Sequence, residues 1–341
     1  MKDLILVTGG TGYIGSHTSV ELINAGYDVV IADNLSNSRR EVLDGIRGIT
    51  GQVPMFEEMD LRDARQVSGL FTKHPDIRAV IHFAAFKSVG ESVLKPLDYY
   101  ENNILSLCNL LKEMKGPAHN VLVFSSSCTV YGEPDNLPVT EESPIKMASS
   151  PYGNTKQISE EIIRDFIASG TSVSAISLRY FNPIGAHPSS LIGELPHGIP
   201  NNLVPYITQT AAGILEELSV FGDDYQTPDG TAIRDYINVA DLSRAHVAAI
   251  ERMLSGNNRS AFEVFNLGTG QGVSVMEVIR AFERATGIRI KYRITDRRDG
   301  DVEKVYADTS LANRELGWKA EVSLEDTLLS AWNWEKKYRN Q

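Results

Sequence analysis

The chain begins with a short apolar run that leads directly into a cluster of glycines. Residues Leu4–Thr8 read Leu-Ile-Leu-Val-Thr, a composition typical of a strand buried in a parallel sheet. Gly9-Gly10-Thr11-Gly12-Tyr13-Ile14-Gly15 follows, and then residues 16–25 have helical character and end before Gly26. In this order of strand, glycine turn and helix, the N–H groups of the helix start can approach a pyrophosphate closely. The N-terminus therefore predicts an α/β fold with a dinucleotide site.

A second predicted strand covers residues 28–32 and ends at Asp33. This carboxylate comes about 20 residues after the glycine turn, where an acidic side chain can bind the adenine ribose hydroxyls. A carboxylate there would repel a 2′-phosphate, so the sequence favours NAD over NADP. The alternative is a glycine-rich turn in another kind of α/β protein. The ordered series of strand, turn, helix, strand and acid argues against that alternative.

Further strand-like stretches alternate with helical ones through the first half of the chain. They cover residues 53–57, 79–83, 121–125 and 174–178. This alternation predicts a Rossmann-type, doubly wound parallel sheet. Residues 183–203 are rich in Pro, Gly, Asn and Ser and indicate a long loop, which in a compact protein is usually functional. A helix at 239–253 and a strand at 262–266 then restore the earlier pattern.

Hydroxyl and amine groups follow the strand predicted at 121–125. Ser125-Ser126-Ser127 ends that strand, and ligands of open α/β sheets bind beyond the carboxyl ends of the strands, so we expect Ser127 to face the cofactor. Tyr152 and Lys156 come next, one helical turn apart and therefore on one helix face. The positive charges of Lys156 and of a bound nicotinamide would favour the phenolate, which makes Tyr152 a candidate base. Taken alone, this pair also fits an ordinary surface helix.

The composition excludes several classes of protein. The 33 Lys and Arg are outnumbered by 44 Asp and Glu, giving a formal charge of −11, which argues against a nucleic-acid partner. No apolar run approaches the roughly 18 residues that span a bilayer, and we expect no signal peptide before the first strand. The two cysteines, Cys108 and Cys128, form neither a disulfide framework nor a zinc pattern, so a cytoplasmic location is expected. The seven histidines show no ligand spacing, and no metal is predicted.

In these motifs the chain resembles the extended short-chain dehydrogenase/reductase family. The residues that carry this resemblance are the glycine turn from Thr8 to Gly15, Asp60-Leu61-Arg62-Asp63, His82-Phe83-Ala84-Ala85, the three serines, and Tyr152 with Lys156. Within that family the chain is similar to the UDP-glucose (UDP-galactose) 4-epimerases over nearly its full length. The closer similarity rests on Lys87-Ser88-Val89-Gly90-Glu91-Ser92, Arg179-Tyr180-Phe181-Asn182-Pro183-Ile184-Gly185-Ala186-His187, Gly198-Ile199-Pro200-Asn201-Asn202-Leu203, Gly230-Thr231-Ala232-Ile233-Arg234-Asp235-Tyr236 and Arg297-Arg298-Asp299-Gly300-Asp301.

The resemblance implies roles for individual residues. Tyr152 would be the base, Ser127 would hold or relay the sugar O4 proton, and Lys156 would bind the nicotinamide ribose and lower the pKa of Tyr152. The implied NAD contacts are Gly9, Gly12, Tyr13, Ile14, Gly15, Asp33, Asn34, Leu35, Ser36, Asn37, Ser38, Asp60, Leu61, Phe83, Ala84, Ala85, Phe86, Lys87, Asn102, Ser127, Tyr152, Lys156 and Phe181. The implied contacts to the UDP-sugar are Ser127, Tyr152, Asn182, Asn201, Asn202, Leu203, Val220, Phe221, Arg234, Arg298, Asp301 and Val305.

The implied reaction inverts the sugar C4 through a 4-keto intermediate and leaves no net redox change. NAD would stay bound through the cycle, because its loss in the reduced form would leave a ketone behind. In the family, the residue at Val305 borders the sugar pocket and is small in members that also accept N-acetylated sugars. We therefore expect UDP-N-acetylglucosamine and UDP-N-acetylgalactosamine to be substrates as well. The alternative is a valine that only packs on a strand.

Other functions remain open on the same fold. A 4,6-dehydratase usually carries an Asp-Glu pair where this chain has Cys128 and Thr129, so dehydration is disfavoured. A net reductase would often prefer NADP, which Asp33 opposes. A uronate epimerase or decarboxylase remains an alternative, as does a non-catalytic NAD-sensing protein.

The family also implies a discontinuous division into two domains. Residues 1–182 with 232–270 would form the Rossmann domain that binds NAD, and residues 183–231 with 271–341 a smaller α+β domain that binds the UDP-sugar. The resemblance further implies a homodimer, formed through the helices near residues 96–114 and 151–168.

Overall fold

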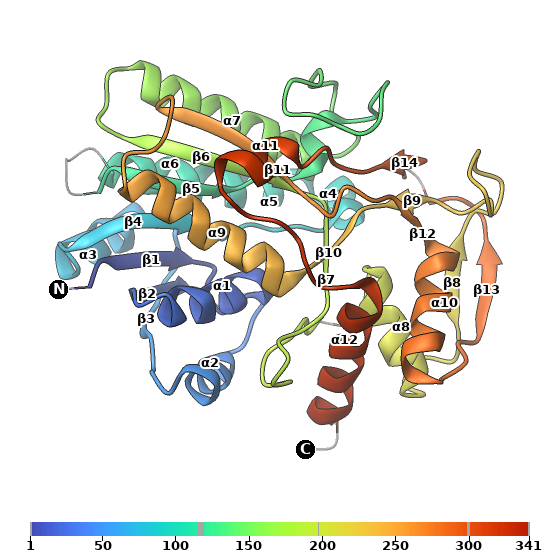
Figure 1. The fold of residues 1–341 in the computed structure, drawn as a ribbon. Helices are drawn as coiled ribbons and strands as arrows, with labels where there is room; N and C mark the ends of the chain where they lie inside the picture. The colour runs from blue at the N-terminus through green and yellow to red at the C-terminus, as the bar shows by residue number, and fades with distance from the viewer. Residues whose placement is uncertain (1, 115–118, 197, 299–300, 340–341) are drawn as a thin grey trace.

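The computed structural model describes residues 2–114, 119–196, 198–298 and 301–339. Within these residues, seven parallel strands form the central sheet in the order β11-β6-β5-β4-β1-β2-β3 (Figure 1). Their bounds are β1 Leu4–Thr8, β2 Asp28–Asp33, β3 Met55–Glu58, β4 Ile77–His82, β5 Val121–Ser125, β6 Ser174–Tyr180 and β11 Phe262–Leu267. The predicted doubly wound sheet is confirmed. Its strand order reverses between β1 and β4, and ligands of such sheets bind at this point.

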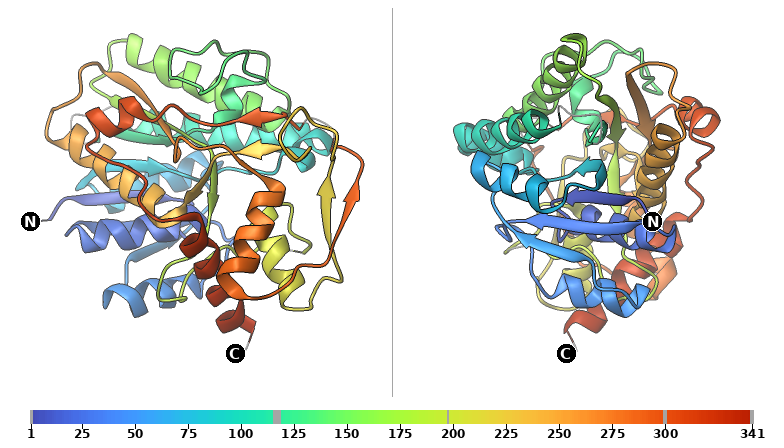
Figure 2. Two further views of the ribbon diagram at one scale, coloured as in Figure 1. Left: turned by 45° about the vertical axis from the view of Figure 1, so that its right-hand side comes forward. Right: turned by 90° about the vertical axis from the view of Figure 1, so that its left-hand side faces the viewer.

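Each strand alternates its side chains between two apolar cores, which is the period of two expected of a sheet. Ile5 and Val7 of β1 pack in one core with α1, α2, α9 and α11, while Leu6 packs in the other with α3, α6 and α7. Figure 2 shows these helices covering both faces of the sheet. The bounds are α1 Tyr13–Asn24, α2 Val42–Thr50, α3 Ala64–Lys73, α6 Ser106–Glu113, α7 Pro151–Ala168, α9 Val239–Leu254 and α11 Ser310–Glu315.

Short helical segments connect β4 to α6 and follow β5. They are α4 Val89–Leu94, α5 Pro96–Tyr100, the π-helical η1 Glu101–Leu105 and the 3₁₀ turn η2 Cys128–Tyr131. Because η2 begins directly after Ser127, it fixes where the serine segment leaves the sheet.

A second, smaller group of elements lies beyond the carboxyl ends of the sheet, around its own apolar core (Figure 1). Its helices are α8 Leu203–Ala211, α10 Val275–Thr286 and α12 Leu324–Arg339. Its short strands are β7 Asn182–Ile184, β8 Leu218–Phe221, β9 Ile233–Arg234, β10 Tyr236–Asn238, β12 Val273–Ser274, β13 Tyr292–Thr295 and β14 Lys304–Val305. The residue bounds that the sequence gives for two domains stay a prediction.

Two sequence-based expectations about local structure hold, although their bounds shift. Helix α1 begins at Tyr13 rather than at residue 16, so the last part of the glycine motif already belongs to the helix. The predicted loop 183–203 starts inside β7, which pairs in parallel with β10, and it contains a bridge between Ala186 and Gly193. Glycine-rich sequence signals a turn, so the sequence placed the helix start too late, and it could not indicate that β7 pairs with the distant β10.

Candidate active site

A cavity of about 1790 Å³ opens at the carboxyl ends of the strands, between the sheet and the smaller group of elements. Pockets for one drug-sized ligand usually measure roughly 300–1,000 Å³. The cavity is therefore large enough for a dinucleotide and a second ligand together. Of the residues that the sequence assigned to the site, all but Leu35 line this cavity.

The glycine turn forms one wall and is shaped by close backbone packing. Gly9 has φ 68°, and a Cβ at this position would lie 2.8 Å from the backbone nitrogen of Ala84 after β4. Gly12 is the N-cap of α1 and provides no side-chain cap, and the first turn of α1 carries no acidic residue. The helix therefore presents free N–H groups and the positive end of its dipole to the cavity. This backbone fits a pyrophosphate.

Asp33 stands at the end of β2 and organises the loop that follows. Its carboxylate accepts hydrogen bonds from the backbone N of Thr11 at 3.2 Å, the backbone N of Leu35 at 2.9 Å and the Ser38 hydroxyl at 3.1 Å. Leu35 has φ 56° and is not part of the cavity wall, so its cofactor contact stays a prediction. The sequence could not reveal this turn, because leucine rarely adopts a positive φ.

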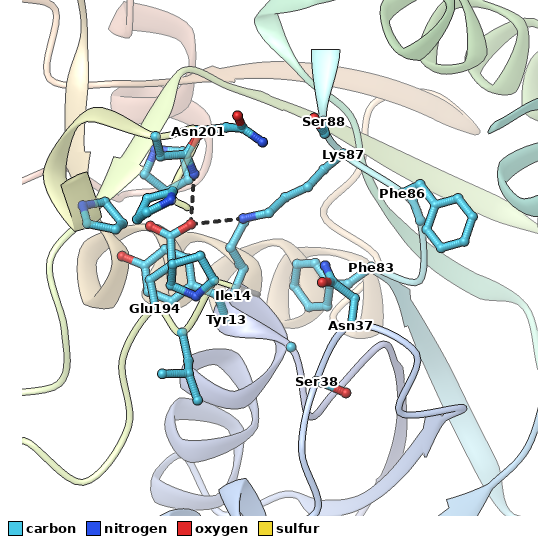
Figure 3. Close-up of a pocket in the computed structure, with 18 of the residues that line it drawn as sticks. Tyr13, Ile14, Asn37, Ser38, Phe83, Phe86, Lys87, Ser88, Glu194 and Asn201 are labelled. Atoms are coloured by element: carbon cyan, nitrogen blue, oxygen red, sulfur yellow. Dashed lines mark hydrogen bonds and ion pairs between the residues drawn. The ribbon is translucent and has the colours of Figure 1, made fainter. Parts of the chain in front are cut away.

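Lys87 reaches across the cavity towards a residue that the sequence did not single out (Figure 3). Its ammonium lies 3.1 Å from Oε1 of Glu194, and the Asn202 side-chain amide donates to the same oxygen at 2.7 Å. The Glu194 carbonyl in turn accepts from the Trp334 indole N–H at 3.1 Å. Glu194 thus contacts both a predicted cofactor residue and a predicted substrate residue. In the sequence, only the position of Glu194 in the loop 183–203 could have suggested a role for it, because its partner Lys87 lies 107 residues earlier in the chain.

Tyr152 and Lys156 project from the first turns of α7, where the Ser150 hydroxyl caps the helix by accepting from the N–H of Gly153. Tyr152 is 9% exposed and Lys156 is 4% exposed. The Lys156 ammonium donates to the Ser125 carbonyl at 2.6 Å and lies 5.9 Å from the centre of the Tyr152 ring. The helix and the end of β5 therefore hold both groups in the cavity wall beside Ser127.

Burial dominates the electrostatics of this pair. It raises the pKa of Tyr152 to about 12, and a hydrogen bond with the Ser127 hydroxyl offsets only part of this. Burial also lowers the pKa of Lys156 to about 7, against the opposing effect of the Glu160 charge. In the protein without a cofactor, burial of the phenol outweighs the groups that favour the phenolate, and the effect of Lys156 on the pKa of Tyr152 stays a prediction. The sequence shows which charges are near, whereas the desolvation of the phenol depends on packing.

The far wall carries the charged residues predicted for the nucleotide-sugar. Arg234 lies 3.6 Å from Asp301, and the Arg298 guanidinium lies over the Phe221 ring, 4.6 Å from its centre. Val220 is 1% exposed, so its side chain mainly belongs to the core of this part. Asn182, Asn201, Asn202 and Leu203 complete this side of the cavity. Asp299 and Gly300, which belong to the same motif as Arg298, lie outside the described residues.

Comparisons with known proteins agree with this geometry. A family model described as GDP-mannose 4,6 dehydratase matches residues 6–330. A UDP-glucose 4-epimerase of Bacillus subtilis is 51% identical over 98% of both chains. The chain belongs to the UDP-glucose 4-epimerases of the extended short-chain dehydrogenase/reductase family.

Solved structures of this epimerase family superpose closely on the chain. An epimerase from Stenotrophomonas maltophila with bound NAD and formylated UDP-arabinopyranose has a TM-score of 0.94 at 50% identity, over 98% of both chains. One from Bifidobacterium longum in complex with NAD+ and UDP has a TM-score of 0.94 at 48% identity, over 99% of both chains.

Val305 occupies the wall next to the expected sugar position. It is 6% exposed and packs in a small apolar cluster with Phe181, Val130, Tyr131 and other buried residues. It also lines the cavity, so its size influences both the packing and the free space.

Within the described residues, no group of three or more His, Cys, Asp or Glu gathers in an arrangement that could hold a metal ion. No helix in the same part of the chain is long and apolar enough to cross a membrane.

Proposed function

We propose that this protein interconverts UDP-glucose and UDP-galactose by NAD-dependent epimerisation at C4. The observation that carries the proposal is the meeting of three residue sets in one cavity. Ser127, Tyr152 and Lys156 line the same cavity as the glycine turn and as Arg234 and Arg298. A dinucleotide on one side and a nucleotide-sugar on the other would meet at the Tyr152 hydroxyl.

The residues of the chain would divide the work as follows. The glycine turn and Asp33 bind NAD, which when bound supplies the oxidation and re-reduction of the sugar carbon. The Tyr152 hydroxyl, once ionised, takes the proton from the sugar O4 and later returns it, and the Ser127 hydroxyl holds or relays that proton. Lys156 binds the nicotinamide ribose. Arg234 and Arg298 hold the diphosphate, so that the sugar can turn while the nucleotide stays fixed.

The proposal is tested by incubating the purified protein with UDP-galactose without added NAD and separating the products. Formation of UDP-glucose supports it, together with release of NAD when the protein is denatured. A non-catalytic NAD-sensing protein would release NAD but form no product. A uronate epimerase or decarboxylase would act on UDP-glucuronate in a parallel incubation and not on UDP-galactose.

Dehydration receives no support from the site. The acidic pair of a dehydratase is replaced by Cys128 and Thr129, and burial raises the pKa of the Cys128 thiol to about 12. A thiol that stays protonated and a hydroxyl cannot readily supply the acid and base that expel water.

We also propose that N-acetylated UDP-sugars are substrates, because Val305 lines the cavity and is small, as the family resemblance implies for members that accept these sugars. Val305→Tyr should suppress kcat/KM for UDP-N-acetylglucosamine at least tenfold more than for UDP-glucose, since a larger side chain in the cavity wall would act most against the bulkier sugar. The measurement is kcat/KM on both substrate pairs for both proteins. A wild-type acetamido rate thousands of times below the glucose rate would contradict this proposal.

We also propose that the protein is a homodimer located in the cytoplasm. Large apolar side chains are exposed on and around α4, α5 and η1: Val93, Leu94, Leu97 and Leu105, of which Leu94 is 82% exposed. Exposed apolar groups gathered in this way are typical of protein interfaces. Sedimentation equilibrium should give the mass of two chains, and Leu97→Glu should shift it towards one. A single-chain mass for the wild type would exclude the dimer.

A further inference from the structure

The three consecutive serines at the end of β5 make three different sets of contacts. The Ser127 side chain faces Tyr152, and the Ser125 carbonyl accepts from the Lys156 ammonium at 2.6 Å. Ser126 does neither: its hydroxyl points away from the cavity and donates to Oε1 of Glu160 at 2.6 Å. The residue between the two functional contacts is therefore tied to a buried carboxylate on α7.

Glu160 is the centre of a fully buried polar network. Its side chain is 2% exposed, and Oε1 also accepts from the Ser177 hydroxyl at 2.7 Å. Arg179 on β6 donates to both carboxylate oxygens, at 3.0 Å from Nε and 2.5 Å from Nη2. Burial raises the pKa of Glu160, but the hydrogen bonds and charge of Arg179 outweigh it and the pKa lies below its usual range. A buried ion pair holds its surroundings in one arrangement only when its other polar atoms are also hydrogen-bonded, and both oxygens of Glu160 are.

The network continues to the other end of the serine segment. Arg179 Nη1 donates to the Tyr131 hydroxyl at 3.0 Å, which donates to the Asn266 side chain at 2.6 Å. Tyr131 ends η2, the turn that starts directly after Ser127. Ser127 is thus held from both sides, through the residue before it and through the last residue of its turn.

We infer that Glu160 and Arg179 are positioning residues for the proposed epimerase reaction, on which this inference rests. Through Ser126 and Tyr131 they fix the backbone that presents the Ser127 hydroxyl and the carbonyl acceptor of Lys156. Glu160 also follows Lys156 by one turn of α7, so the network joins the helix that carries the base to the strand that carries the serine. A displacement of about 1 Å at reacting groups can reduce the rate a hundredfold, so such bracing affects turnover.

Ser126 and Ser177 provide a matched pair of variants. Both hydroxyls are 0% exposed, both donate to the same oxygen of Glu160, and neither residue lines the cavity. Ser126→Ala and Ser177→Ala each remove one hydrogen bond of the same kind, so they should lower Tm by similar amounts. Only Ser126 belongs to the segment that presents Ser127, whereas Ser177 lies on β6.

The test compares kcat and KM for UDP-galactose in the wild type and both variants. Ser126→Ala should lower kcat about tenfold with KM unchanged, while Ser177→Ala should keep kcat within about twofold. Amide hydrogen exchange over residues 125–131 provides a readout that does not depend on turnover. Exchange there should accelerate in Ser126→Ala and stay as in the wild type in Ser177→Ala.

Equal effects of the two variants on kcat and on exchange would overturn the inference, because the network would then only stabilise the fold. An unchanged kcat and exchange in Ser126→Ala would overturn it as well. A wild type that does not convert UDP-galactose would instead contradict the proposed function, and the exchange comparison would still decide whether the network positions this segment.

Discussion

The two walls of the cavity are built in different ways. The wall beneath the expected cofactor consists of strand ends and the first turns of α1 and α7, and its reactive side chains Tyr152 and Lys156 are almost completely buried. On the opposite wall, Arg234 sits on a two-residue strand and Arg298 on a loop, where they contact Asp301 and Phe221. The comparison indicates that the proposed catalytic groups are placed by the sheet and its helices, whereas the proposed diphosphate contacts come from a short strand and a loop.

The largest effect should come from the rigid wall. Lys156→Met removes a buried charge at nearly constant volume and should lower kcat by about 10²–10³ while KM for UDP-galactose stays within a few-fold. The Tm should not fall, because burial of this ammonium is unfavourable, as its pKa of about 7 shows. Steady-state kinetics and a melting curve check both expectations.

Lys73→Met is a suitable control for that experiment, since Lys73 is exposed, pairs with Glu57 and, like Glu57, does not line the cavity. It should leave kcat and KM as in the wild type. A Lys156→Met protein with a normal kcat would show that the buried ammonium is structural and would remove the contrast between the walls.

The opposite wall should show an effect on binding alone. Arg298→Ala removes a charge-assisted contact to phosphate, so KM for UDP-galactose should rise by about 10- to 100-fold with kcat nearly unchanged. Its neighbour Arg297 provides the control, because it pairs with Asp224 at 2.7 Å, stacks on Tyr225 and does not line the cavity. A fall in kcat rather than a rise in KM for Arg298→Ala would mean that the two walls are not separable.

The ionisation of Tyr152 gives a smaller and more specific test. Without a cofactor the pKa of Tyr152 is about 12, so the phenol stays protonated at pH values well above the ordinary pKa of tyrosine. A bound nicotinamide cation favours the phenolate, so NAD should lower this pKa by about one unit or more. Tyrosinate absorbance across an alkaline titration, taken as the difference between wild type and Tyr152→Phe, measures it with and without NAD. An identical titration in both forms would show that the cofactor does not tune the base.

The sequence predicted the parts of the site that are encoded locally. The glycine turn after Leu4–Thr8 requires close backbone packing, and Tyr152 and Lys156 share a face because they are one helical turn apart. The parallel sheet followed from the alternation of apolar strands and helices. These features depend on neighbours in the chain, so they can be read without knowing the fold.

The sequence did not reveal what depends on distant partners or on burial. Glu194 meets Lys87 across the cavity, and Glu160 meets Arg179 between α7 and β6, through contacts that no local pattern indicates. The raised pKa of Tyr152 was not indicated by the sequence, because desolvation is a property of packing. The positive φ of Leu35, 56°, likewise belongs to the loop that Asp33 organises and is not indicated by the residue type.

The central claim is that the Tyr152 hydroxyl exchanges the sugar O4 proton beside a retained NAD. The most direct measurement is the kcat for UDP-galactose of the wild type and of Tyr152→Phe, with the NAD content of both proteins determined after denaturation. We expect equal NAD content and a kcat at least about a hundredfold lower in Tyr152→Phe. A kcat within a few-fold of the wild type, at equal NAD content, would contradict it.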